Sequence, residues 1–385
     1  MTGLRRTLAR ELAFLRGNGW DLALLTWIPL VLLAMMSWLF AAGVARDLPV
    51  AVVDNDHGAA ARHYVQLLDA TPGVRVSARP LSLDAGFALV RRGDVWAVVV
   101  VPAGTSRTID RGGVGTLIAY PNAAYSTQSG AVMRDIGSAS ARLGLGLAIG
   151  TGARLKGGAA TNVPPLRVEA RTLFNPQTSY ELLLVPLVHT AMLHLLMCLA
   201  AASAVGRELR DGTAPAWLDA AGGDIIAAVI GKLLPYLAVY SVFSVAALAA
   251  FSLGGWPVAG NAWLLIAAHV LLYLAYAGIG VLFVGLTRNM MMSLSLIGVY
   301  AGASLAFCGA LFPTDGAPLF TRIFSLMTPY AWFARTQAQQ LESAAPMAAT
   351  LPLLGAMLVF AIISFGLALP LLKGLARDPA SWGLR

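Results

Sequence analysis

The sequence has little charge and almost no cysteine. Only 12% of its 385 residues are Asp, Glu, Lys or Arg, whereas soluble domains carry about 25%. The two cysteines, Cys198 and Cys308, both lie in apolar runs, so a disulfide framework in the polar part of the chain is excluded. The shortage of charge excludes an ordinary soluble protein.

A phosphate-binding loop is also missing. Such a loop needs the pattern Gly-x4-Gly-Lys-Ser/Thr, because backbone amides and the Lys together hold the phosphates. The nearest stretch is Gly231-Lys232-Leu233, which has no hydroxyl residue after the Lys and no Gly at the required spacing. We therefore expect no enzymatic activity and no cofactor in this chain, and any ATP must bind another chain.

The run Asp54-Asn55-Asp56 resembles the start of a calcium-binding loop but lacks its later positions. Ala59 and Val65 stand where the sixth-position Gly and the twelfth-position Glu belong. We expect these carboxylates to form the turn after a strand and to cap the next helix.

Long apolar runs are the main feature that the sequence does contain. Hydrophobic residues make up 58% of the chain, the mean hydropathy is +0.71, and a membrane-spanning helix needs about 20 such residues in a row. Pro29 should kink the first run. The pattern predicts a polytopic α-helical membrane protein with six transmembrane helices, at residues 22–44, 182–205, 225–253, 262–286, 290–312 and 351–372.

Residues 46–178 differ from the rest because short strand and helix patterns alternate there. The run 95–101 is rich in Val and is typical of a buried strand. Alternation of this kind predicts an inserted α/β domain with an open sheet. The predicted strands are 48–53, 74–78, 95–101, 116–120 and, after Pro164-Pro165, a return strand at 166–173; the predicted helices are 57–69, 83–91 and 128–149.

The N-terminal residues carry charge throughout and do not have the pattern of a cleaved leader. Leu4, Leu8, Leu12 and Leu15 fall on one helical face, which indicates an amphipathic helix in the membrane interface. A simple positive flank to the first span is the alternative. Lys and Arg in the short loops place both termini in the cytoplasm and residues 46–178 outside it. The net charge of +8 then favours contact with anionic membrane lipid, not nucleic acid.

Three histidines lie inside predicted spans, His189 and His194 in the second and His269 in the fourth. A spacing of five residues puts His189 and His194 about 140° apart on a helix, so they cannot hold one metal ion from one face. Two interpretations remain for these residues. Either they are neutral and hydrogen-bonded across helices, or they line a substrate cavity.

A charged loop joins the second and third spans, and its residues resemble a known family. Glu208, Gly212 and Thr213 are similar to the Glu-Arg-Glu-x-Gly-Thr-x-Glu segment of type-2 ABC exporter permeases, although Leu209, Arg210 and Pro215 depart from it. The resemblance implies that loop 206–224 is a coupling helix that docks on a separate ATPase subunit. A plain hydrophilic turn is the alternative.

Each residue of this loop has an expected role in ATPase coupling. Glu208, Arg210 and Asp211 offer charged contacts, and Gly212-Thr213 should turn the chain and cap the short helix. Pro215 suits the first turn of that helix. Trp217 and Leu218 are expected to form an apolar knob for a groove on the ATPase.

The segment 313–349 is similar to the family's pair of re-entrant outer helices. Its apolar face is Leu319, Ile323, Phe324 and Met327, and Thr328-Pro329 marks the break. An amphipathic surface segment is the alternative interpretation. The resemblance implies an outer gate at Phe312, Pro313, Pro329 and Tyr330.

The layout resembles that family over nearly the whole chain. Residues 1–45 are the interfacial helix and first span, 46–178 the extracytoplasmic domain, and 179–385 the remaining five spans. The resemblance implies a permease subunit of an ABC exporter in the bacterial inner membrane, within the subgroup that has a large extracytoplasmic domain.

The resemblance also implies partners and a substrate class. The expected partners are an ABC ATPase, a second permease in a homodimer or heterodimer, and a periplasmic adaptor protein on the outer domain. The expected substrate is an amphiphile such as a drug or lipid. The alternative from another class is a membrane-anchored receptor or scaffold whose outer domain binds a ligand.

Overall fold

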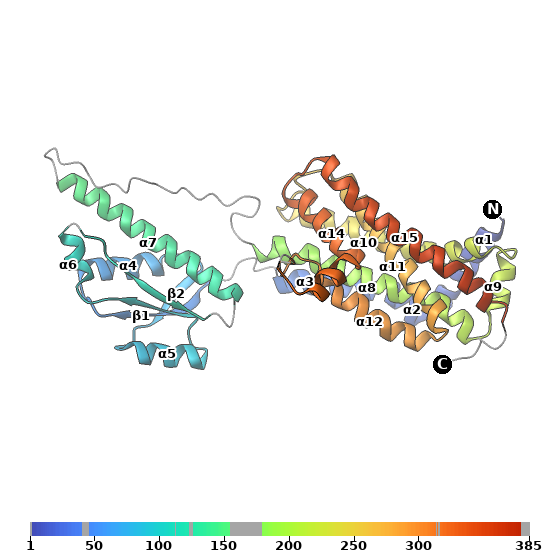
Figure 1. Cartoon of the computed structure of the whole chain (residues 1–385), viewed down its shortest axis with the longest axis horizontal. Coiled ribbons are helices and arrows are strands. Elements are labelled where there is room, and N and C mark those ends of the chain that lie inside the picture. The colour runs from blue at the N-terminus through green and yellow to red at the C-terminus, as the bar shows by residue number, and fades with distance from the viewer. Residues whose placement is uncertain are drawn as a thin grey trace. The chain divides into compact units, whose positions relative to one another are not determined.

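The computed structural model describes residues 2–40, 46–111, 113–122, 126–154, 179–312, 314 and 316–378. The chain forms two units, one of Met1–Ala41 with Thr172–Arg385 and one of Ala42–Arg171. Figure 1 shows that the first unit is helical and that the second contains a sheet. The predicted break at Pro164-Pro165 and the return strand at 166–173 lie outside the described residues.

The helical unit supplies six helices, among the described residues, that are long and apolar enough to cross a membrane. They include the continuous pair α2–α3 and agree with the six predicted spans. The elements are α1 (Thr2–Gly17), α2 (Gly19–Leu25), α3 (Trp27–Phe40), α8 (Tyr180–Arg210), α9 (Ala214–Ala220), α10 (Ile225–Leu253), α11 (Ala262–Thr287), α12 (Met290–Phe307), α13 (Leu319–Leu326), α14 (Pro329–Gln337), the π-helical turn η1 (Ala338–Glu342) and α15 (Met347–Leu375).

Two spans depart in detail from the prediction. The first breaks at Thr26, where φ is −115° and ψ is −82°, because Pro29 lacks the N–H that would bond the carbonyl of Leu25. The predicted kink is therefore present, three residues before the proline. The fifth span, α12, ends at Phe307 instead of residue 312. Gly309 has a φ of +83°, a conformation that ends helices and that glycine adopts without strain.

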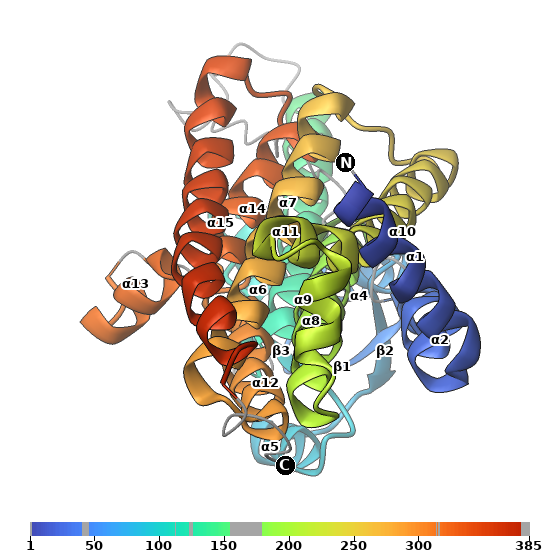
Figure 2. The same ribbon diagram turned by 90° about the vertical axis from the view of Figure 1, so that its right-hand side faces the viewer.

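Helix α11 is the centre of the helical unit and lies between α8 and α15 (Figure 2). Small residues allow this close approach. A Cβ added to Gly280 would lie 2.5 Å from the carbonyl oxygen of Cys198 on α8, and one added to Gly278 would lie 2.9 Å from Cβ of Ser364 on α15. The backbone of α11 therefore packs directly against both neighbours.

The second unit is built on a small four-stranded sheet with the order β2-β1-β3-β4. Strands β2, β1 and β3 are parallel, and β4 runs antiparallel to β3. Each strand overlaps a predicted one. The elements are β1 (Leu48–Asp54), α4 (Ala59–Asp69), β2 (Val74–Ala78), α5 (Leu83–Arg92), β3 (Ala97–Val101), α6 (Thr105–Asp110), β4 (Ile118–Pro121) and α7 (Ser126–Arg154).

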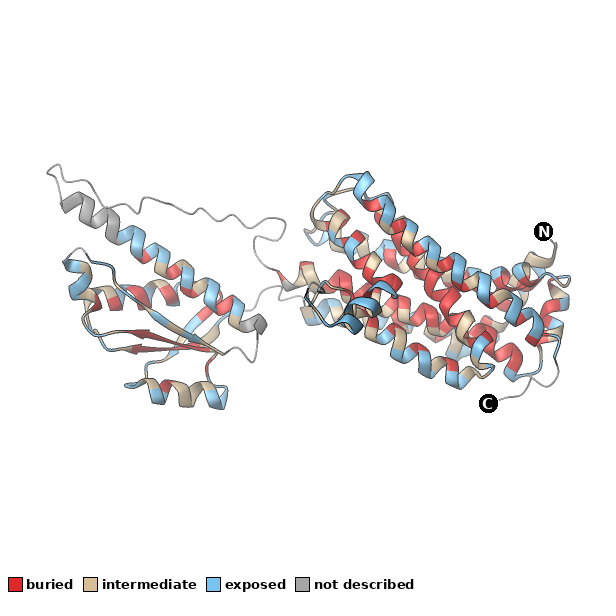
Figure 3. Ribbon diagram, viewed as in Figure 1, coloured by how far each residue is buried: buried red, intermediate tan, exposed pale blue. Residues whose placement is uncertain are grey.

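Helices cover both faces of this sheet. Alternate residues of β1 and β3 point to opposite sides, so Val52 and Val99 pack toward α4 and α7 while Val53 and Val98 pack toward α5. Figure 3 shows the buried positions concentrated on these two central strands.

The turn after β1 forms as predicted, but its capping differs. Asp54 accepts hydrogen bonds from the amides of Asp56 and His57 at 3.0 and 2.9 Å. Asp56 does not cap α4, the next helix; it accepts from the amide of Ser106 in α6 at 3.1 Å. The hydroxyl of Ser106 donates to Asp56 and accepts from the amide of Ala60 in α4. Burial raises the pKa of Asp56, but the hydrogen bonds from Ser106, together with those from the backbone of Gly58 and Gly104, outweigh burial and lower that pKa.

Candidate coupling site

The segment between α8 and α10 contains the predicted short helix. Gly212, with a φ of +67°, turns the chain after α8, and α9 then begins with Pro215 in its first turn. Gly222 and Gly223 also have positive φ and lead into α10. The side chain of Asp224 caps α10 by accepting from the amide of Ile226 at 2.9 Å.

Trp217 and Leu218 do not form the predicted apolar knob. They are 1% and 5% exposed and pack within this chain. The indole nitrogen of Trp217 donates to the carbonyl of Ala228 in α10 at 3.2 Å. Because the bundle offers a dry surface beside α9, its apolar face turns inward. The exposed residues of α9 are Ala216 and Asp219.

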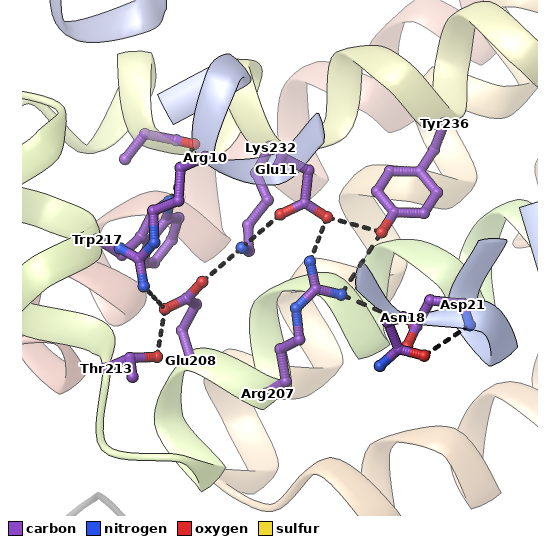
Figure 4. Close-up of polar contacts among 11 residues, drawn as sticks. Arg10, Glu11, Asn18, Asp21, Arg207, Glu208, Thr213, Trp217, Lys232 and Tyr236 are labelled. Atoms are coloured by element: carbon purple, nitrogen blue, oxygen red, sulfur yellow. Dashed lines mark hydrogen bonds and ion pairs between the residues drawn. The ribbon is translucent and has the colours of Figure 1, made fainter. Parts of the chain in front are cut away.

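Glu208 is also buried, so the prediction that it contacts a partner surface is wrong. It is 4% exposed, and Figure 4 shows three donors converging on its carboxylate. They are Arg10 of α1 at 2.8 Å, Lys232 of α10 at 2.6 Å and the hydroxyl of Thr213. Thr213 occupies the N-cap position of α9, but its side chain makes no capping bond, because it donates to Glu208 instead.

A second buried carboxylate, Glu11 of α1, completes the cluster. It contacts the guanidinium of Arg207, and it accepts from Nζ of Lys232 at 2.8 Å and from the hydroxyl of Tyr236 at 2.7 Å. Burial raises the pKa of Glu11, but the charges of Lys232 and Arg207 outweigh that effect and hold the pKa below its usual range. Glu11 is therefore ionised near neutral pH.

These contacts form one continuous row of charges with alternating sign, which we call the ion chain. Its end members are partly exposed, with 32% of the Arg10 side chain and 17% of the Asp21 side chain accessible. The four inner members are buried. Three positive and three negative charges balance, which offsets the cost of removing them from water. The ion chain runs Arg10–Glu208–Lys232–Glu11–Arg207–Asp21.

Close backbone contact accompanies the ion chain. A Cβ added to Gly231 of α10 would lie 2.8 Å from Cβ of Thr7 in α1. One added to Gly3 would lie 2.3 Å from the carbonyl oxygen of Ala221, just after α9. Helix α1 therefore lies directly against α10 and the turn that precedes it.

The packed face of α1 shares only Leu15 with the leucine face that the sequence suggested. Thr7, Glu11 and Leu15 are buried, whereas Leu4 and Leu8 are half-buried and Leu12 is exposed. The helix itself is confirmed. Its inner face carries Glu11 because that position meets Lys232 and Arg207.

Arg210 and Asp211 remain at the surface, as the coupling prediction requires. Both are exposed. Nε and Nη2 of Arg210 donate to the two carboxylate oxygens of Asp211 at 2.7 and 3.0 Å. Their role in coupling stays a prediction.

The three histidines are hydrogen-bonded across helices, which is one of the two interpretations of the sequence. His194 lies between the rings of Tyr276 and Tyr330, at centroid distances of 4.2 and 4.7 Å, and its Nε2 is 3.0 Å from Oγ of Ser304. Nε2 of His189 is 3.0 Å from the carbonyl oxygen of Leu33.

His269 makes similar contacts, with Nε2 3.3 Å from Oγ1 of Thr190 and the ring 4.6 Å from that of Phe333. A groove of about 250 Å³ lies in the helical unit, but its lining includes none of these histidines. Their role in a substrate cavity stays a prediction.

The segment predicted as a re-entrant pair forms the two short helices α13 and α14, broken at Thr328-Pro329. Phe312 is exposed and Pro329 begins α14. Tyr330 is fully buried and donates to the carbonyl of Leu187 in α8 at 2.7 Å. Pro313 lies outside the described residues. A gate function for these residues stays a prediction.

Sequence reasoning missed Glu11, Lys232 and Tyr236. A signal for two of them was present. Lys232 interrupts a long apolar run, and a charge inside a membrane span usually has a partner. Glu11 is the one acidic residue among residues 2–17, where the other charges are all Arg. Tyr236 gave no signal that distinguishes it from other tyrosines in the spans.

Six candidate spans in the described residues, with a short helix held between two of them, indicate a multi-pass membrane protein. The family model for ABC-2 family transporter proteins matches residues 20–369, so the chain belongs to the ABC-2 transporter family. No curated protein and no solved structure matches it. As an ABC transporter permease, the chain is a membrane transport component whose family implies an ABC ATPase partner.

Proposed function

We propose that this chain is the permease subunit of an ATP-driven exporter in the bacterial inner membrane. It moves an amphiphile, such as a drug or lipid, out of the cytoplasm or the inner leaflet, and a separate ATPase subunit supplies the energy. Family membership supports the transport role. The lack of a phosphate-binding loop in the sequence supports a separate ATPase.

The observation that carries this proposal is the two-sided character of α9. One side is fixed to the bundle through Trp217, which is buried and bonded to α10. The other side exposes Ala216 and Asp219, next to exposed Arg210 and Asp211. A partner that binds the exposed side therefore acts on both α8 and α10. The charged groups offer hydrogen bonds worth about 1.5–3 kcal/mol each.

The distribution of Lys and Arg supports cytoplasmic termini and an extracytoplasmic position for the unit Ala42–Arg171. This arrangement is the one expected of the subgroup with a large outer domain, on which a periplasmic adaptor protein would bind. Two permease chains, identical or different, would assemble with the ATPase.

Charge reversal on the exposed side of α9 tests the docking site. Arg210→Glu with Asp219→Lys should lower the amount of ATPase that purifies with the permease, because each lost charged contact weakens binding about tenfold or more. Arg322→Glu is the matched control, since Arg322 is an exposed cation on α13. Wild-type recovery of the ATPase with the double variant would refute docking on α9.

A further inference from the structure

Helix α10 is held on its two sides by different kinds of contact. On one side, Lys232 and Tyr236 make directional polar bonds to Glu11 of α1. On another side, α10 and α15, together with α11 and Met197 of α8, line the groove of about 250 Å³, whose lining residues are all apolar. Apolar contacts have no preferred direction, so helices joined by them can shift relative to one another. Buried ion pairs, in contrast, lose their stabilisation when one partner moves.

Helix α1 contacts loop 206–224 at three places. Glu11 contacts Arg207 near the end of α8. Arg10, the adjacent residue, binds Glu208 one residue further along α8 at 2.8 Å. At the start of α1, Gly3 lies against Ala221 after α9. Every turn of α1 from Gly3 to Glu11 therefore contacts the segment around α9 or the helices on either side of it.

We propose that α1, α9, the end of α8 and the first turns of α10 move as one unit, and that Glu11 is the positioning residue that holds α1 in it. When α9 is displaced, this unit moves as a whole. The relative movement then occurs between α10 and α15, where the contacts are apolar, and not between α1 and α10. That an ATPase displaces α9 rests on the proposed function, whereas the existence of the moving unit rests on the contacts of Glu11.

Loss of the Glu11 charge should release α1. Glu11→Gln leaves Arg207 and Lys232 with one anion fewer between them, so the row of alternating charges is interrupted at its centre. Glu11→Asp keeps the charge on a side chain shorter by one methylene. It should therefore restore part of the attachment, which a role in filling space alone would not predict.

Distances between spin labels measure this attachment in the full-length protein bound to its ATPase in lipid nanodiscs. Labels on Arg5→Cys and Ile226→Cys report on α1 and α10, and labels on Arg5→Cys and Lys373→Cys report on α1 and α15. All three positions are exposed. The native Cys198 and Cys308 are buried, so a sample without introduced cysteines gives the background.

The expected result has two parts. In the wild-type background, the α1–α10 distance is the same with ADP and with ATP plus vanadate, while the α1–α15 distance shifts. In Glu11→Gln, the α1–α10 distribution broadens and shifts with nucleotide, and Glu11→Asp is intermediate. Glu342→Gln, which removes a carboxylate outside the ion chain, should behave as wild type. An α1–α10 distance that shifts in the wild type, or that is unaffected by Glu11→Gln, would overturn the proposal.

Failure of the proposed function gives a different result. If no ATPase purifies with the wild-type chain, the comparison of ADP with ATP plus vanadate does not apply. The width of the α1–α10 spin-label distance distribution, measured on the permease alone, still decides the role of Glu11. A narrow distribution in the wild type and a broad one in Glu11→Gln supports it. Equal widths overturn it.

Discussion

At position 11 a carboxylate lies between two cations with 1% of its surface exposed. Removing one partner of a buried pair leaves the other charge uncompensated, which costs about 3–5 kcal/mol. We therefore expect Glu11→Gln and Lys232→Met each to lower the free energy of unfolding by that amount. The double variant removes one charge of each sign and should lose less than the two single losses combined.

Thermal unfolding of the purified protein checks this coupling. Arg92→Gln is the matched control, because the pair Arg92–Asp94 is exposed and exposed pairs contribute about 0–1 kcal/mol. Equal, small changes in the unfolding temperature of the two single variants, the double variant and Arg92→Gln would contradict a stabilising role for the ion chain.

The lowered pKa of Glu11 predicts a pH dependence of definite sign. A carboxyl whose pKa is depressed in the folded state contributes stability above its unfolded pKa, and that stability is lost as pH falls toward the folded pKa. The stability difference between wild type and Glu11→Gln should therefore be largest near neutral pH and should shrink below about 4.5, the ordinary value for Glu.

Lys232→Met changes this dependence in a predictable way. Without the Lys232 charge, burial opposes ionisation of Glu11 more effectively, since burial acts to raise its pKa. The loss of stability on acidification that Glu11 contributes should then be smaller than in the wild type, because the folded-state pKa of Glu11 is less depressed relative to its unfolded value. Unfolding curves measured from pH 3 to 7 on the wild type, Glu11→Gln and Lys232→Met test these two pH predictions. Parallel pH profiles of stability for the wild type and Lys232→Met would contradict the effect of Lys232 on Glu11.

At the scale of elements, the close crossing of α1 and α10 predicts the effect of a single methyl group. Gly231→Ala should displace α1, because the added Cβ would lie 2.9 Å from the carbonyl oxygen of Leu4. Gly298→Ala in α12 is the control, since nothing lies within 4 Å of that position. Alanine favours a helix over glycine by about 0.5–1 kcal/mol at both sites.

Amide hydrogen exchange measures this displacement. Exchange across residues 2–17 should be faster in Gly231→Ala and unchanged in Gly298→Ala. Slow exchange of α1 in both variants would show that the crossing tolerates the extra volume.

The sequence was sufficient to predict the spans and strands because their signals are local. An apolar run of bilayer length becomes a helix such as α11, and the Val-rich run becomes β3. The side chains that face a partner depend instead on contacts distant in sequence. The inward turn of Trp217 depends on α10, and the burial of Glu208 depends on Arg10, which is 198 residues away. No pattern in residues 206–224 contains that information.

For the whole molecule, the proposed orientation gives a direct test. Cysteines introduced at Arg107, exposed on α6, and at Lys373, exposed near the end of α15, should react with a membrane-impermeant reagent from opposite sides. In intact cells, once the outer membrane is permeabilised, Arg107→Cys should be labelled, and Lys373→Cys should require disruption of the inner membrane. Labelling of both in intact cells would contradict the predicted topology.

The distance in sequence between Glu11 and Lys232 also affects how the chain is made. They are 221 residues apart, and synthesis at about 5–20 residues per second leaves roughly 10–45 s between them. During that interval α1 has left the ribosome while its buried carboxylate still lacks its partner on α10. Helix α1 therefore cannot complete its buried contacts until α10 has been made, and a nascent chain stopped before α10 would present α1 to the chaperones and proteases of the cell.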